Sequence, residues 1–191
     1  MAISAEDRQV LQSTRLLLTH VRDQTGLAYA DDTWSPISDI TLDIIARQMG
    51  GVIVLEELGA NTQEIGIPGY FGTPAIVVNR LIPGGFRRLA LRHGLAHLAA
   101  GELEVGQENE VRFMSSILDY DTLEERRADL FALADLVPDR LLDEILLGGA
   151  RVRDLPAAIA REVRRYAPEW PARRVRDRSR LRAELFGERR E

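Results

Sequence analysis

The sequence predicts an α+β fold in which a small β-sheet lies beside several helices. Short stretches rich in β-branched residues are confined to residues 52–79, and helical spacing of apolar residues dominates the rest of the chain. A length of 191 residues, with 45% hydrophobic and 29% charged residues, fits one compact globular domain with or without a helical appendage. We therefore predict a first domain over residues 1–138 and a helical C-terminal extension, packed on it, over residues 139–191.

The first half of the chain is predicted to contain two helices and three strands. Residues 5–25 place apolar side chains at helical spacing, and Gly26 is a typical residue to end that helix. A second helix begins at Ser38 or Asp39, either of which can cap its first turn, and stops at Gly50-Gly51. Apolar stretches bounded by turn residues predict the strands, at residues 52–55, 65–71 and 74–79.

The third predicted strand is the candidate for contact with an extended peptide. It contains Ile76, Val77, Val78 and Asn79, and it begins with Pro74, a residue that fits only the start of a strand or an edge. An edge strand beside a binding site can accept an extended peptide as an additional strand. The alternative is an ordinary edge strand with no such role.

The second half of the chain is predicted to be mainly helical. An Ala/Leu-rich helix spans about residues 87–101, with Pro83 able to occupy its first turn. Thr122, with Glu125 three residues later, forms a capping box that starts another helix, and Pro138 closes that helix. Further helices are predicted at about residues 110–118, 139–147, 154–166 and 171–186.

The Ala/Leu-rich helix carries two candidate metal ligands. His93 and His97 are four residues apart, so their imidazoles lie one turn apart on one helix face. Such a pair can bind one metal ion, for which zinc is the usual candidate. The chain has no cysteine, so any further protein ligand must be a histidine or a carboxylate. In the metallopeptidase motif H-E-x-x-H the glutamate is the general base, and Gly94 stands in its place here.

Glu125 is the candidate third ligand. Two histidines leave zinc one short of the three protein ligands of a typical catalytic site. Asp129 follows Glu125 by one helical turn, so Glu125 could bind the metal while Asp129 accepts a hydrogen bond from a ligand imidazole. The alternative is that Glu125 only completes the capping box and that Asp129 is a solvated acid.

These motifs resemble those of the ImmA/IrrE-type metallopeptidases, a gluzincin-like family of bacteria and their mobile elements. The segment Arg88-Leu-Ala-Leu-Arg-His-Gly-Leu-Ala-His97 is similar to the family's R-x-T-L-A-H-E-L-G-H, and Ile76-Val-Val-Asn79 is similar to the strand before its metal helix. The segment Glu125-Arg-Arg-Ala-Asp-Leu-Phe-Ala132, closing with Leu136-Val-Pro138, is similar to E-x-E-A-N-x-F-A…L-L-x-P. The resemblance covers about residues 5–138, and residues 155–187 are weakly similar to the helix pair that follows in the family.

The resemblance implies a zincin-like domain, with a twisted sheet beside the metal helix and zinc as the cofactor. The implied activity is cleavage of a protein partner, often a helix-turn-helix repressor. Matched residue by residue, His93, His97 and Glu125 correspond to the zinc ligands, Asp129 to a position beside them, and Gly94 to the catalytic glutamate. Loss of a positioned general base typically costs about 10²–10⁴ in rate. We therefore expect a proteolytically impaired protein that acts in regulation by binding a protein partner.

The charged residues are unevenly distributed. Residues 151–191 contain 13 arginines and seven acidic residues, a net charge of +6, whereas residues 1–150 have a net charge of −11. Such a basic tail can bind nucleic acid, and the alternative is a solvated helix face with ion pairs four residues apart. The N-terminus lacks the features of a secretory signal, and no apolar run reaches the ~18 residues of a membrane span. We predict a cytoplasmic protein with no membrane partner.

Three alternatives to the impaired peptidase stay open at this point. The first is an active zinc endopeptidase with a relocated general base, for which Glu56, Glu57 or Asp121 would have to fold into place. The second is a DNA-associated regulator that uses the Arg-rich tail. The third is a protein that no longer binds metal, in which the histidines are relics in the core.

Overall fold

The computed structural model of the chain describes residues 3–25, 39–103, 113–116 and 121–188. The predicted α+β class is confirmed, because these residues form a four-stranded sheet and a set of helices. The helices are α1 (Ala5–Thr25), α2 (Asp39–Gln48), α3 (Gly84–Ala99), α4 (Leu123–Leu136), α5 (Asp139–Leu147), the 3₁₀-helix η1 (Val152–Asp154), α6 (Leu155–Tyr166) and α7 (Ala172–Gly187). The strands are β1 (Val52–Glu56), β2 (Thr62–Tyr70), β3 (Thr73–Asn79) and β4 (Phe113–Ser116).

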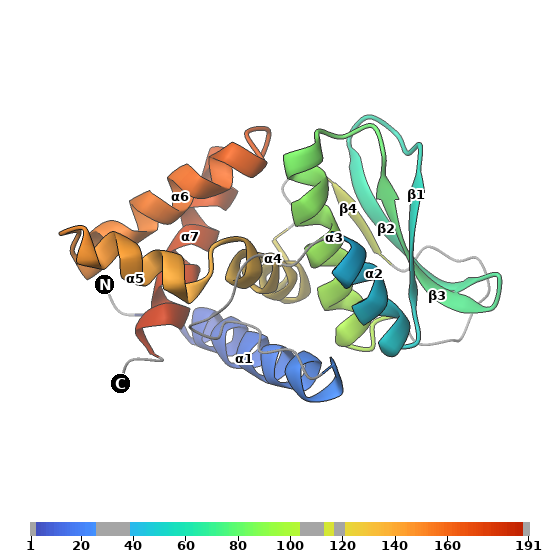
Figure 1. The fold of residues 1–191 in the computed structure, drawn as a ribbon, viewed down its shortest axis with the longest axis horizontal. Helices are drawn as coiled ribbons and strands as arrows, with labels where there is room; N and C mark the ends of the chain where they lie inside the picture. Colours follow the sequence, from blue (N-terminus) through green and yellow to red (C-terminus); the bar gives the residue numbers. More distant parts are fainter. Residues whose placement is uncertain (1–2, 26–38, 104–112, 117–120, 189–191) are drawn as a thin grey trace.

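Helix α3 occupies the centre of the fold. Figure 1 shows the sheet at one end of the molecule with α3 against it, α4 next to α3, and α6 and α7 toward the other end. Accordingly α3 contacts β2 and β3 on one side and α4 on the other. Every residue from Leu89 to Ala99 is buried. This stretch of α3 is covered on all sides, so its two histidines lie deep in the protein.

The sheet has the strand order β1-β3-β2-β4, with β1 parallel to β3 and the other pairs antiparallel. Strand β3 is therefore bonded to a neighbour on both sides. The prediction that Ile76, Val77, Val78 and Asn79 form an edge strand open to an extended peptide is wrong, and all four side chains are buried. A strand covered on both faces reads as a continuous apolar run. Pro74 is the second residue of this strand and lies before its pairing with β1 begins at Ala75, where the register with β2 also shifts, a position that proline tolerates.

The turn between β2 and β3 contains a strained residue. Tyr70 pairs with Thr73, so the connection is the two-residue turn Phe71-Gly72. Both residues have positive φ, 49° for Phe71 and 81° for Gly72, as in the type I′ turns that match the twist of a hairpin. Glycine adopts this backbone without cost, but a bulky side chain such as that of Phe71, which is 91% exposed, does not.

Strand β4 replaces part of a predicted helix. Residues 113–116 pair antiparallel with β2, where Met114 lies opposite Ile65, so the helix predicted around residues 110–118 is wrong for this segment. The pairing is a contact between segments far apart in the sequence, which local propensity does not report. The other residues of that predicted helix lie outside the described parts of the chain.

The C-terminal helices are integrated with the rest of the protein. A single core cluster includes residues of α1, α3, α4, α6 and α7, among them Val10, Leu95, Phe131 and Leu181. Three arginines of α7 are buried: Arg174, Arg178 and Arg182. The Arg-rich tail is thus neither a free basic extension nor only a solvated face with ion pairs four residues apart. The domain boundary after residue 138 stays a prediction.

A buried ion-pair network ties α1 to α4 and α7. The Asp7 carboxylate of α1 pairs with Arg126 of α4 and with Arg180 of α7, the latter at 2.7 Å. Burial acts to raise the pKa of Asp7, but a hydrogen bond from Ser4 and the charges of Arg180 and Arg126 outweigh it, so the pKa is lowered. The N-terminal helix is therefore held by charges from α4 and α7.

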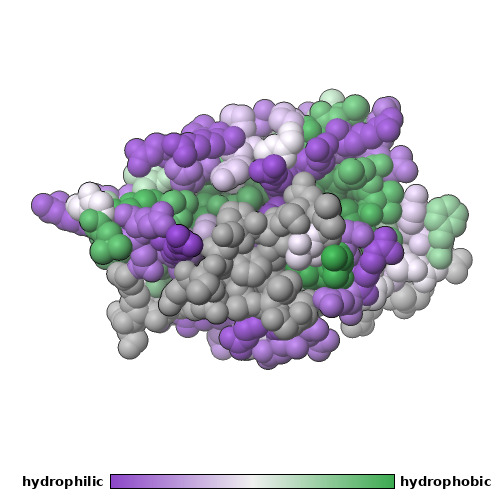
Figure 2. All heavy atoms as spheres, in the orientation of Figure 1, coloured by the Kyte–Doolittle hydropathy of each residue, from purple (hydrophilic) through white to green (hydrophobic). Residues whose placement is uncertain are grey.

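The face of the molecule shown in Figure 2 is mostly hydrophilic along α6 at its upper edge and α1 at its lower edge. This is the expected surface of amphipathic helices that bury one side in the core. None of the described helices combines the length and apolar character required to cross a bilayer.

Candidate metal centre

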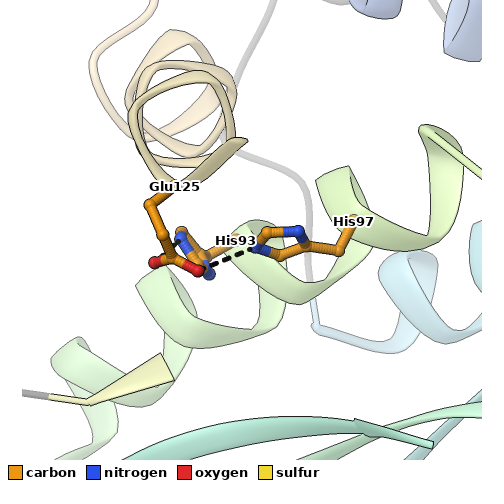
Figure 3. A group of neighbouring side chains, drawn as sticks. All are labelled: His93, His97 and Glu125. Atoms are coloured by element: carbon orange, nitrogen blue, oxygen red, sulfur yellow. Dashed lines mark ion pairs between the residues drawn. The ribbon is translucent and has the colours of Figure 1, made fainter. Parts of the chain in front are cut away.

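Two helices bring the three predicted ligands together. His93 and His97 lie one turn apart on α3, and Glu125 lies in the first turn of α4. Thr122 caps α4, because its hydroxyl accepts a hydrogen bond from the Glu125 backbone N–H at 3.2 Å. Glu125 therefore both takes part in the helix cap and points its carboxylate at the histidines (Figure 3). The part of the predicted capping box that the structure records uses the Glu125 backbone N–H, whereas the Glu125 carboxylate faces the two histidines.

The distances fit a site for one cation. One candidate ligand atom from each of His93, His97 and Glu125 lies within 4.8 Å of the other two, and all three residues are buried. The two Glu125 oxygens lie 3.3 Å from His93 Nε2 and 3.5 Å from His97 Nε2. His93 Nε2 and Glu125 Oε2 are buried without a hydrogen-bond partner among the described residues. Buried polar atoms are normally satisfied, so atoms left in this state and facing each other mark a place for an ion.

Carboxylates on the outer side of each ring fix the orientation of the imidazoles. Glu64 of β2 contacts His93 Nδ1, and Glu102, just after α3, contacts His97 Nδ1. A carboxylate at Nδ1 holds the proton there, which makes Nε2 the nitrogen that would bind a metal. Both Nε2 atoms point toward Glu125. Sequence reasoning missed both carboxylates in this role.

Glu102 reaches His97 because of how α3 ends. Gly101 has φ 74°, and the backbone N–H groups of Gly101 and Glu102 donate to the carbonyls of Leu98 and His97 at 3.0 and 3.1 Å. These two bonds form a Schellman motif, which reverses the chain immediately after the helix. The glycine that the sequence identified as a helix end thereby places the next side chain beside a ligand. Arg127 of α4 also pairs with Glu102 and holds it there.

Glu64 has no comparable local signal. It is a fully buried carboxylate near the start of β2, in the polar segment Thr62-Gln63-Glu64. The predicted strand begins at residue 65, so the sequence does not show that this charge is buried and requires a partner. Its partner, His93, could be identified only once β2 was placed against α3.

The protonation of the site follows from its carboxylates. Burial disfavours a charge on His93, but Glu64 and Glu125 outweigh this effect and raise its pKa to about 10. The pKa of Glu125 is lowered correspondingly, since burial is outweighed by the two histidines. Without a metal, a proton on His93 therefore balances the buried carboxylates. A divalent cation would displace that proton, so metal binding should release protons to solution.

Asp129 has a different role from the one predicted. Its oxygens accept hydrogen bonds from Arg174 at 2.9 Å and from Arg178 Nε at 2.7 Å. Asp129 Oδ1 lies 3.5 Å from His93 Nε2, on the ligand side of the ring, and so does not hold the ring proton. The predicted hydrogen bond from a ligand imidazole to Asp129 is therefore replaced by the contacts of Glu64 and Glu102. Burial acts to raise the pKa of Asp129, but the charges of the two arginines outweigh burial, so the pKa is lowered.

The general-base position is filled by a hydrophobic side chain. A Cβ atom built at Gly94 would lie 2.3 Å from Ile76 Cγ2 of β3. Helix α3 and strand β3 approach each other so closely that no side chain fits at residue 94 unless Ile76 moves. Glycine at residue 94 is thus part of a packing arrangement that also involves the neighbouring strand.

No other carboxylate described in the structure stands in for that base. Glu57 pairs with Arg80 at the surface, and Asp121 pairs with Arg178 at 3.0 Å. Neither these two nor Glu56 forms an ion pair with the ligand histidines among the described residues. The carboxylates that do so are Glu64, Glu102, Glu125 and Asp129. The pKa values of Glu102, Glu125 and Asp129 are lowered by the histidines and arginines beside them, which makes these carboxylates weak proton acceptors, and Glu64 is engaged by His93 Nδ1.

No family model, no curated protein and no solved structure matches this chain. The case for a metal site therefore rests on the geometry of His93, His97 and Glu125 and on the carboxylates that orient them. A buried group of this kind can bind a metal ion, and the donor set of two imidazoles and one carboxylate suits zinc among several divalent metals.

Proposed function

We propose that this chain is a zinc-binding protein of the ImmA/IrrE type that is impaired as a peptidase and acts in regulation through a protein partner. The observation that carries the proposal is the combination of an intact ligand set with a filled general-base position. His93, His97 and Glu125 converge on one point, whereas Ile76 occupies the space beside Gly94. A zincin-like fold, with a metal helix beside a small sheet, is part of this proposal.

The residues of the chain would hold zinc as a three-ligand site. His93 and His97 would bind through Nε2, with Glu64 and Glu102 keeping the Nδ1 protons in place. Glu125 would supply the carboxylate ligand. Zinc bound there would act as a Lewis acid. Three protein ligands are typical of catalytic rather than structural zinc sites, which supports descent from an active peptidase.

Proton transfer is the step that these residues do not support. In a peptidase of this kind a carboxylate must accept a proton at the nucleophile and deliver it to the leaving amine. Glu64 and Glu102 lie on the outer side of the histidine rings, and Asp129 is held by two arginines. The loss of a positioned base typically lowers the rate about 10²–10⁴-fold. A role in binding a partner, for which a helix-turn-helix repressor is our candidate, does not require this step.

The metal content of the purified protein tests the first half of the proposal. Elemental analysis of the wild type should give about one zinc per chain after expression with zinc supplied. His93→Ala and Glu125→Ala should lose it. His20→Ala is the matched control, because His20 is exposed on α1 and outside the cluster, and it should keep the metal. Absence of metal from the wild type would mean that the histidines are relics and would refute the proposal.

A cleavage assay tests the second half. The wild type with zinc, manganese or cobalt should not cleave a broad panel of peptides and repressor proteins. Cleavage that disappears in His93→Ala would instead establish the alternative of an active endopeptidase with a relocated base. The double variant Gly94→Glu with Ile76→Ala restores the H-E-x-x-H sequence and makes room for the new side chain, so it is the variant expected to gain zinc-dependent cleavage.

A further inference from the structure

A basic cavity lies beside the candidate metal centre. It has a volume of about 300 Å³ and is lined by six arginines, Arg126 of α4 and five from α7, together with the two aspartates Asp121 and Asp177. The protein as a whole has a net charge of −5, whereas the residues that line this cavity are mostly positively charged. A cavity with such a lining attracts anions.

Part of the positive charge in this cavity is uncompensated. Both lining aspartates are bound to Arg178, Asp121 at 3.0 Å and Asp177 at 2.6 Å. Arg173 and Arg176, in contrast, are exposed and form no ion pair or hydrogen bond with any other described residue. They are three residues apart on α7, so they project from the same face of the helix.

A buried donor inside the cavity points to a ligand. Arg126 Nε is buried and has no hydrogen-bond partner among the described residues, although the Arg126 side chain is only 7% exposed. The nearest carboxylate oxygens lie 3.7 Å away on Asp177 and 3.8 Å away on Asp121, too far for a hydrogen bond. An N–H group left in this state is normally satisfied by an acceptor, and the cavity is where that acceptor would lie.

We propose that this cavity binds a phosphate group. Planar guanidinium groups match phosphate oxygens in bidentate geometry, and a phosphate dianion would balance Arg173 and Arg176 while accepting from Arg126 Nε. The occupant we favour is a small phosphate ester rather than a duplex. Tight duplex binding uses about 6–10 phosphate contacts along a surface, and this cavity offers two unpaired guanidinium groups in a concave site.

Calorimetric titration of the full chain at low salt tests the proposal. The probes are inorganic phosphate, adenosine 5′-monophosphate, a short DNA duplex and malonate, a dicarboxylate of similar charge. We expect saturable binding of phosphate or the nucleotide at one site per chain. The double variant Arg173→Gln/Arg176→Gln should lower this affinity about tenfold, the effect of losing charge-assisted hydrogen bonds.

A matched control separates site binding from general electrostatics. Arg161→Gln/Arg164→Gln removes the same charge from exposed positions on α6 that do not line the cavity, and it should leave the affinity unchanged. Equal losses in the two double variants, no saturable binding of any phosphate probe, or equal affinity for malonate would each overturn the proposal. Duplex binding that is tighter than nucleotide binding and depends on Arg173 and Arg176 would identify a nucleic-acid backbone as the source of the phosphate.

The cavity is independent of the proposed metal chemistry. None of the three metal ligands lines it, so His93→Ala should leave phosphate binding unchanged. A protein that binds phosphate but no metal would refute the proposed function alone, and a protein that binds metal but no phosphate would refute only the cavity assignment.

Discussion

The contact between Gly94 and Ile76 allows a quantitative test of the packing at the general-base position. Gly94→Ala places a Cβ atom 2.3 Å from Ile76 Cγ2, whereas carbon atoms in contact are ordinarily about 3.5–4.0 Å apart. The methyl group must therefore move by more than about 1 Å, and the β-branched side chain of Ile76 is stiff at χ1. The substitution should overpack the interface between α3 and β3.

Two opposing terms set the magnitude. Overpacking of a core typically costs about 1–3 kcal/mol, and replacing glycine with alanine in a helix gains about 0.5–1 kcal/mol. Gly94→Ala should therefore lower the free energy of unfolding by about 0–2.5 kcal/mol net. Alanine usually stabilises a protein when it replaces a glycine within a helix. A lower free energy of unfolding for Gly94→Ala would therefore show that the new methyl group clashes with Ile76.

A double-mutant cycle measures the contact directly. Ile76→Ala alone should cost about 2–5 kcal/mol, since it leaves a cavity. In the double variant the new methyl at residue 94 occupies part of that cavity, so the combined loss should be smaller than the sum by about 1 kcal/mol or more. Urea denaturation followed by circular dichroism gives the four free energies, provided that the m-values agree. Losses that add within about 0.5 kcal/mol would show that the two residues do not compete for space.

Three further predictions concern other parts of the protein. Glu64→Gln should weaken zinc binding about 10–100-fold, because it removes the carboxylate that orients His93. Competition with a chromogenic chelator measures the affinity for zinc, and an unchanged affinity would contradict the role assigned to Glu64. Asp7 has a lowered pKa in the folded protein, so its stabilising effect is present above its unfolded pKa of about 3.9 and is lost as the pH falls through the folded value. The denaturation midpoints of the wild type and Asp7→Asn should consequently differ at pH 7 and converge in acid, and a constant difference would count against the ion pairs. Phe71→Gly should stabilise the protein by about 1 kcal/mol by relieving the positive φ of an exposed residue, as measured by thermal unfolding. A lower midpoint would show that the edge-to-face contact of Phe71 with Tyr70, 4.9 Å between ring centroids, outweighs the strain.

The helices of this protein were predictable because their signals are local. Thr122 and Pro138 mark the limits of α4, and the periodicity of apolar residues gives α1, α6 and α7 within a few residues of their observed ends. The three residues of the candidate metal centre, which the structure brings together, were identified from equally local signals. The spacing of His93 and His97 and the position of Glu125 in a first helical turn are properties of short segments.

The features that could not be predicted depend on which segments meet in space. The position of β3 inside the sheet depends on β1 and β2 pairing with it from either side, and nothing in Ile76 to Asn79 distinguishes that arrangement from an edge. The partners of His93 and Asp129 come from β2 and α7, which are 29 and 45 residues away in the sequence. Membership of the ImmA/IrrE-type family stays a prediction.

The pairing of Asp129 with Arg174 and Arg178 also constrains the order in which the protein can assemble during synthesis. A buried charge without a partner typically costs about 3–5 kcal/mol. The two arginines follow Asp129 by 45 and 49 residues, so at elongation rates of about 5–20 residues per second they appear about 2–10 s later. During that interval α4 cannot settle into its final position at low cost. Helix α7 therefore completes the environment of candidate ligands that were made well before it.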